Sequence, residues 1–110
     1  MSIPESGDII LVSLDPTKGH EQGGYRPCLV ISQTYYNKRV NMCVVLPITH
    51  SKKGYPFEIE LPSSLKTDGV ILSDSINTID IKVRSFKIVE RVPGPILNKC
   101  RKNVSKLIGA

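Results

Sequence analysis

The sequence predicts a mainly β fold with one C-terminal helix (α+β), arranged as a small barrel or sandwich. Short apolar or β-branched runs, each bounded by turn residues, recur from residue 7 to about residue 90. The hydrophobic period then changes to three and four residues, which is typical of an amphipathic helix. The chain has 110 residues, 40% of them hydrophobic and 23% charged. This is the composition of one ordinary domain, here expected to span 1–110.

The strands are expected from their local patterns. Residues 57–61, Phe-Glu-Ile-Glu-Leu, alternate apolar and charged side chains, which is the period of a strand with one solvated face. A short helix is expected at 34–38, with Tyr35 and Tyr36 packed on the barrel. The other expected strands are 8–14, 27–32, 41–46, 70–72, 77–81 and 86–89.

The C-terminal helix is expected to begin after the Pro-Gly-Pro sequence at 93–95 and to stop at Gly109. Its core face is predicted to hold Ile96, Leu97, Cys100, Val104, Leu107 and Ile108. Its opposite face is predicted to hold Lys99, Arg101, Lys102 and Lys106 without an acidic residue, either as a solvated face or as a surface that recruits an anionic partner.

The charge and the cysteines exclude several classes of protein. The net charge of +5 favours anionic partners such as nucleic acid or an acidic peptide. No apolar stretch approaches the roughly 18–20 residues of a membrane-spanning helix, and the first residues do not resemble a secretory signal, so a cytoplasmic protein is expected. The chain has three cysteines, Cys28, Cys43 and Cys100, which are far apart in the sequence. Their odd number and wide spacing argue against a disulfide framework and a zinc site.

One long loop at 15–26 carries the titratable groups that suggest chemistry. It contains three glycines and brings His20, Glu21 and Arg26 within seven positions. An imidazole, a carboxylate and a guanidinium are the groups that general acid and base chemistry around a phosphate requires. Arginine suits this role because its planar fork can hold two phosphate oxygens. On spacing alone, an ion pair of Arg26 with Asp15 or Glu21 is an equally ordinary outcome.

The order of the residues, however, closely resembles the MazF, PemK and Kid family of toxins from bacterial toxin-antitoxin systems. The resemblance begins with Gly-Asp-Ile at 7–9 and the string Leu-Asp-Pro-Thr-Lys-Gly-His-Glu-Gln-Gly-Gly-Tyr-Arg-Pro at 14–27, followed by Leu-Val-Ile-Ser at 29–32. The resemblance continues with Pro-Ile-Thr at 47–49. It also includes the segments 53–58, 68–70 and 78–80, Asp74, and the end of the final helix. It therefore covers essentially the whole chain.

This resemblance implies an SH3-like small barrel of the CcdB/MazF type, a homodimer, and sequence-specific cleavage of single-stranded RNA without a metal or cofactor. In the family's mechanism the ribose 2′-OH attacks the adjacent phosphate and leaves a cyclic phosphate and a free 5′-OH. The toxin inhibits translation and growth until an acidic MazE/PemI-like antitoxin neutralises it. A single-stranded substrate is expected because a paired A-form helix hides its base edges.

Residue by residue, the resemblance implies a catalytic set and an RNA-binding set. Arg26 would stabilise charge on the phosphate, Thr49 would hold a phosphate oxygen by its hydroxyl, and Glu21 is the candidate base. Tyr25 is the aromatic residue most expected to meet a base. The predicted RNA-binding residues are His20, Gln22, Tyr25 and Asp74.

Several alternatives stay open at this point. Asp74 matches a residue to which the Kid branch assigns the base role, but Leu72 and Ser75 replace the neighbours found there, so the base could be Glu21, Asp74 or His20. His50 has no clear counterpart and is expected to be a surface residue. A gyrase-binding toxin of the CcdB type would depend on a C-terminal tryptophan, and this chain has none. A barrel that binds RNA without cutting it is the third possibility.

Overall fold

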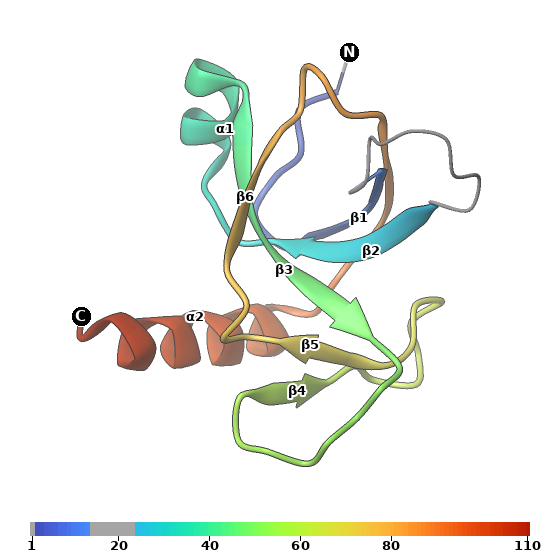
Figure 1. Ribbon diagram of the computed structural model, residues 1–110, viewed down its shortest axis with the longest axis vertical. Coiled ribbons are helices and arrows are strands. Elements are labelled where there is room, and N and C mark those ends of the chain that lie inside the picture. Colours follow the sequence, from blue (N-terminus) through green and yellow to red (C-terminus); the bar gives the residue numbers. More distant parts are fainter. Residues whose placement is uncertain (1, 14–23) are drawn as a thin grey trace.

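The computed structural model describes residues 2–13 and 24–110, and confirms a mainly β fold with a C-terminal helix (Figure 1). The strands follow in chain order and one short helix interrupts them. The elements are β1 (Asp8–Ser13), β2 (Tyr25–Val30), α1 (Thr34–Val40), β3 (Met42–Thr49), β4 (Glu58–Glu60), β5 (Val70–Leu72), β6 (Asn77–Asp80), β7 (Phe86–Arg91) and α2 (Gly94–Ile108).

The described strands form one barrel-like sheet that is not closed. Its order is β4-β5-β3-β2-β1-β7, and β6 pairs with β3 beside this path. All pairs are antiparallel, as is usual where short connections join neighbouring strands. Because β3 is the longest strand, its first half pairs with β6 and its last two residues pair with β5. β3 thus joins the barrel to the β4–β5 pair.

Alternation along the strands divides the core into two clusters. On β3, Cys43 and Val45 face one cluster, whereas Leu46 and Ile48 face the other. The first cluster lies between the sheet and α2, which runs beside β5 in Figure 1. It contains Ile9, Leu29, Leu46, Ile48, Leu61, Ile71, Val92 and Cys100. The second cluster, inside the curled part of the sheet, contains Ile10, Val12, Cys28, Val30, Cys43, Val45, Ile79 and Ile81.

Several details differ from the sequence prediction. β2 begins at Tyr25 rather than at residue 27, and β3 continues through Pro47 to Thr49 instead of turning after residue 46. Tyr35 is 75% exposed, so the expectation that it packs on the barrel is wrong, whereas Tyr36 is half-buried. A two-turn helix covers the barrel with one side only, so its other side remains in water.

The α2 helix ends as predicted, followed by Gly109 in the left-handed conformation, but it begins at Gly94, within the Pro-Gly-Pro sequence and not after it. Arg101, however, is not part of a fully solvated face, because it is half-buried and its Nη2 donates to Ser6 Oγ at 2.5 Å. Among the described residues, the helices are all too short or too polar to cross a membrane.

Candidate functional site: the open ends of β2 and β3

Arg26 and Thr49 both lie at the ends of strands, where the sheet register relates them. The β2–β3 ladder ends where Cys28 pairs with Pro47, and Arg26 on β2 and Thr49 on β3 each lie two residues beyond this last pair. Cys28 and Val45 both face the second core cluster. By alternation, Arg26 and Thr49 project to the same side of the sheet, beyond the point where the core ends. We call this pair the strand-end site.

The guanidinium of Arg26 is presented to solvent by its place on β2. Arg26 is exposed, and it pairs in the β1–β2 ladder with the buried Val12. The neighbouring Tyr25 is 54% exposed. The first two residues of β2 therefore present an aromatic ring and a cation to solvent, on opposite faces of the strand because successive side chains alternate. These groups suit a base and a phosphate, respectively.

The Thr49 hydroxyl is oriented by its own turn. The amide of Ser51 donates to Thr49 Oγ1 at 3.1 Å, which directs an oxygen lone pair into the turn. A hydroxyl that accepts from an amide still has a proton to donate. Thr49 also lines a small hollow of about 160 Å³ together with Ser51, Lys53, Tyr55, Glu58 and Leu72. This geometry suits a threonine that donates to an oxygen anion.

The turn that walls this hollow is fixed by a carboxylate. Glu58 accepts hydrogen bonds from the amides of Lys53 and Gly54, both at 2.8 Å. The bond from the Lys53 amide is the largest of the effects that lower the pKa of Glu58. Glu58 is therefore a structural anion of the turn, and its lone pairs are already directed at backbone amides.

Gly69 permits the close approach of β5 to Thr49, which sequence reasoning did not single out. Gly69 has a φ of +115°, and a Cβ atom there would lie 2.5 Å from the Thr49 carbonyl oxygen. The next residue, Val70, pairs with Thr49 in the β3–β5 ladder. The position of Thr49 therefore depends on a glycine in another loop. In the sequence, the indication for this role was that Gly69 follows Asp68 in the segment 68–70, which resembles the family.

Comparison with known proteins agrees with this arrangement of strands. The family model of the PemK-like, MazF-like toxins of type II toxin-antitoxin systems matches residues 5–108. The chain belongs to this family. It is 40% identical over 107 residues to the endoribonuclease toxin MazF of Escherichia coli K12, covering 97% of this chain and 96% of that protein.

Solved structures of the family share the fold closely. The crystal structure of MazF from Deinococcus radiodurans (Form-I) has a TM-score of 0.89 and 34% identity, with both chains covered completely. A MazE-MazF structure from the same organism (Form-II) has a TM-score of 0.88 and 30% identity, covering 99% of this chain and 98% of that chain. The predicted family membership is thus confirmed.

The remaining residues predicted from the PemK-like and MazF-like pattern divide into two groups. His20, Glu21 and Gln22 lie outside the described residues. Asp74 is half-buried and accepts a hydrogen bond from the Tyr55 hydroxyl at 2.9 Å. This bond is the largest of the effects that raise the pKa of Tyr55. In this structure Asp74 therefore holds Tyr55 at the wall of the hollow beside Thr49.

His50 lies next to Thr49 in sequence but belongs to a different surface. It is exposed, as predicted, and its Nε2 lies 2.7 Å from Asp68 Oδ1. The hydrogen bond from His50 is the main reason why the pKa of Asp68 is lowered. Both residues line a separate hollow of about 510 Å³, which also includes Lys52 and Glu60.

The cysteines do not supply the chemistry of the site. Cys28, Cys43 and Cys100 are buried and unbridged, as the sequence predicted. Burial raises the pKa of each thiol to about 11, and for Cys28 this outweighs the opposing charge of Arg26. At neutral pH the thiols are therefore protonated and weak as nucleophiles and as metal ligands. Across 2–13 and 24–110, the titratable residues form no cluster of three or more metal-ligating side chains.

Proposed function

We propose that this chain is an endoribonuclease toxin that cleaves single-stranded RNA at the strand-end site. The observation that supports the proposal is the register of β2 and β3, in which Arg26 and Thr49 each lie two residues beyond the last pair and, by alternation, on the same side of the sheet. The MazF relative at 40% identity is named an endoribonuclease, which favours cleavage over binding to gyrase.

The reaction begins when the ribose 2′-OH attacks the adjacent phosphorus. Negative charge then grows on the phosphate oxygens, where a fixed guanidinium and a hydroxyl donor stabilise it. Arg26 supplies the guanidinium, and Thr49 supplies the hydroxyl donor. Breaking the bond to the 5′ oxygen gives a 2′,3′-cyclic phosphate and a free 5′-OH, so no water is consumed in this step.

Protons must leave the 2′-OH and reach the departing oxygen. Glu21, which lies outside the described residues, is the proposed base that takes the proton of the 2′-OH, and Arg26 is the proposed donor of a proton to the departing 5′ oxygen. The contact between Asp74 and Tyr55 makes Asp74 less suited to the role of base, because one of its oxygens is already engaged. Side chains can in this way supply the base and the charge stabilisation without a metal ion.

The protein is proposed to act in the cytoplasm as a homodimer that an acidic antitoxin inhibits. One structural relative is a MazE-MazF complex, in which a toxin of this fold occurs with an antitoxin. In this chain the basic residues concentrate at 81–110, which contains eight Lys and Arg against one Glu. A basic surface and an acidic segment that folds on binding suit each other.

The test is cleavage of a mixed RNA pool by the wild type and by Arg26→Ala, in excess EDTA. We expect the variant to lose about 10²- to 10³-fold in single-turnover rate, the range found when one donor to a developing oxyanion is removed. Arg39→Ala is the matched control, because Arg39 is an exposed arginine on α1. It should cleave at the wild-type rate.

Full activity of Arg26→Ala would refute the assignment of Arg26, provided that both variants unfold at the wild-type temperature. Loss of wild-type cleavage in EDTA, restored by a divalent cation, would refute the metal-free mechanism. Mapping the 5′ ends of the fragments from the same reaction would give the cleavage sequence.

A further inference from the structure

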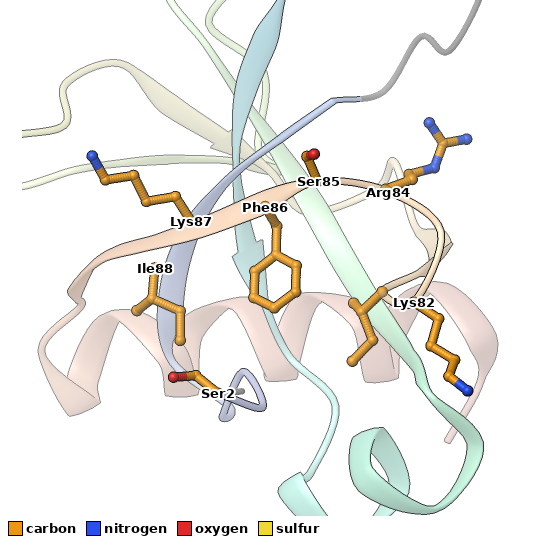
Figure 2. Close-up of a pocket in the computed structure, with 8 residues that line it drawn as sticks. Ser2, Lys82, Arg84, Ser85, Phe86, Lys87 and Ile88 are labelled. Atoms are coloured by element: carbon orange, nitrogen blue, oxygen red, sulfur yellow. The ribbon is translucent and has the colours of Figure 1, made fainter.

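One hollow on the described surface lies away from the strand-end site, along β7. It has a volume of about 540 Å³ and is lined by Ser2 and by residues 81, 82 and 84–88. We call it the β7 hollow (Figure 2). Its lining contains three cations, Lys82, Arg84 and Lys87, and no carboxylate. Lys82 and Lys87 are both exposed, so their charges are available to a partner.

An aromatic ring, which also packs against the second core cluster, lines the same hollow. Phe86 is half-buried, and its ring extends into the hollow between Ile88 and Lys82, while Lys87 extends away on the other side (Figure 2). Proteins bind single-stranded nucleic acid with surfaces that combine aromatic rings and cations, because a ring stacks on a base and the cations contact phosphates. An acidic peptide would use the lysines but would have no use for the ring.

The carboxylate of Asp80, in the turn before β7, does not neutralise the cations of the β7 hollow. Asp80 Oδ1 accepts from the amides of Lys82 and Val83, at 2.9 and 3.2 Å, and thereby closes the turn before β7. Its charge is thus directed at backbone amides and not at the lysine side chains. This turn also fixes the backbone from which Lys82 projects.

Arg84 connects the β7 hollow to the strand-end site. Its Nη1 donates to the carbonyl of Ser13 at 2.7 Å, which anchors the side chain at the end of β1. Arg84 also lines a hollow of about 210 Å³, whose other walls include Cys28 on β2 and Pro47 on β3. These two residues lie two positions from Arg26 and Thr49, on the same side of the sheet. An RNA strand that leaves the strand-end site can follow this surface past Arg84.

We propose that the β7 hollow is a second subsite for the RNA substrate, which binds a nucleotide remote from the bond that is cut. Phe86 stacks on the base, Lys82 and Lys87 contact the flanking phosphates, and Arg84 lies on the path between the two sites. This inference rests on the proposed function, since it concerns the same substrate. It adds a determinant of affinity that takes no part in bond breaking.

The experiment measures binding of a labelled 12-nucleotide random RNA pool in which every 2′ oxygen is methylated and therefore cannot attack. The test variant is Lys82→Ala/Lys87→Ala. Its matched control is Lys38→Ala/Arg39→Ala, which removes the same charge from exposed positions on α1. We expect the first variant to lose about tenfold or more in affinity at 0.1 M salt. The slope of log affinity against log salt should fall by about 1.4, because two single-strand phosphate contacts are lost.

The control should lose at most about twofold. A second variant, Phe86→Leu, keeps an apolar side chain at this place and should lose about fivefold or more if a base stacks on the ring. In single-turnover cleavage of unmodified RNA, the protein concentration that gives half of the maximal rate should rise by the same factors for both hollow variants. Thermal unfolding confirms that the variants are folded.

Equal losses in the test and control variants would overturn the proposal, because general charge would then explain binding. A loss of affinity only for a 12-residue polyglutamate peptide would also overturn it and would identify the hollow as a peptide site. A change in sedimentation of the RNA-free protein would overturn it in favour of a contact between copies. Failure of the wild type to cleave any RNA would instead refute the proposed function.

Discussion

The strand-end site and the C-terminal third of the chain carry opposite kinds of charge arrangement. Residues 1–80 contain seven basic and nine acidic residues, whereas residues 81–110 contain eight basic and one acidic. In the first part, acidic side chains are engaged in fixed contacts, such as Glu58 with two amides and Asp74 with Tyr55. In the second part, Lys82, Lys87 and most α2 lysines are exposed.

This difference separates two physical tasks. Stabilising a reacting phosphate requires few groups, held within a fraction of an ångström by a rigid scaffold. Attracting a polyanion requires many charges and little precision, because electrostatic attraction acts over about a Debye length. Substitutions around Thr49 should therefore change the rate of cleavage, whereas substitutions on α2 should change the approach of RNA.

The largest effect in this comparison is expected from Gly69→Ala. The added Cβ would lie 2.5 Å from the Thr49 carbonyl oxygen, and the φ of +115° is unfavourable for alanine. We expect a loss of about 2–4 kcal/mol in the free energy of unfolding, from backbone strain and overpacking together. Because Thr49 would be displaced, cleavage by the folded fraction should fall about 10²-fold. Denaturant unfolding and single-turnover cleavage measure the two effects.

The control for this variant is Gly109→Ala. Gly109 has a φ of +80°, but an added Cβ would meet no neighbouring atom within 4 Å, so only the backbone strain applies. It should lose stability without losing the single-turnover rate. If Gly69→Ala cleaved as fast as Gly109→Ala, the position of Thr49 would not depend on this close approach.

A smaller effect is expected from Thr49→Val, which keeps the shape of the side chain but removes the hydroxyl. A hydrogen bond to a charged oxygen contributes about 1.5–3 kcal/mol, so the single-turnover rate should fall about 10- to 100-fold. The Ser51 amide also loses its acceptor, but it is exposed and can bind water. Thr49→Ser retains the hydroxyl and should retain most of the activity. Equal rates for the valine and serine variants would remove Thr49 from the catalytic set.

The sequence was a good guide to local structure and a poorer guide to contacts between distant segments. Alternation at 57–61 and the change of period after residue 93 are local properties, and both elements formed as predicted. The continuation of β3 to Thr49 was missed because it depends on Val70 of β5, which completes the ladder beyond a proline. Likewise, only the folded chain brings Ser6 to Arg101 and Gly69 to Thr49.

The smallest effect is expected from Lys99→Ala/Lys102→Ala on the exposed face of α2. Arg101 is left intact because its bond to Ser6 Oγ would confound charge with the packing of the N-terminal segment. We expect the association rate with single-stranded RNA to fall roughly two- to fivefold at low salt and to match the wild type at about 0.5 M salt, where screening is strong. The single-turnover rate at saturating protein should be unchanged, because neither lysine belongs to the strand-end site. A selective loss of that rate, with association unaffected, would contradict the separation of recruitment from chemistry and would place α2 within the catalytic unit.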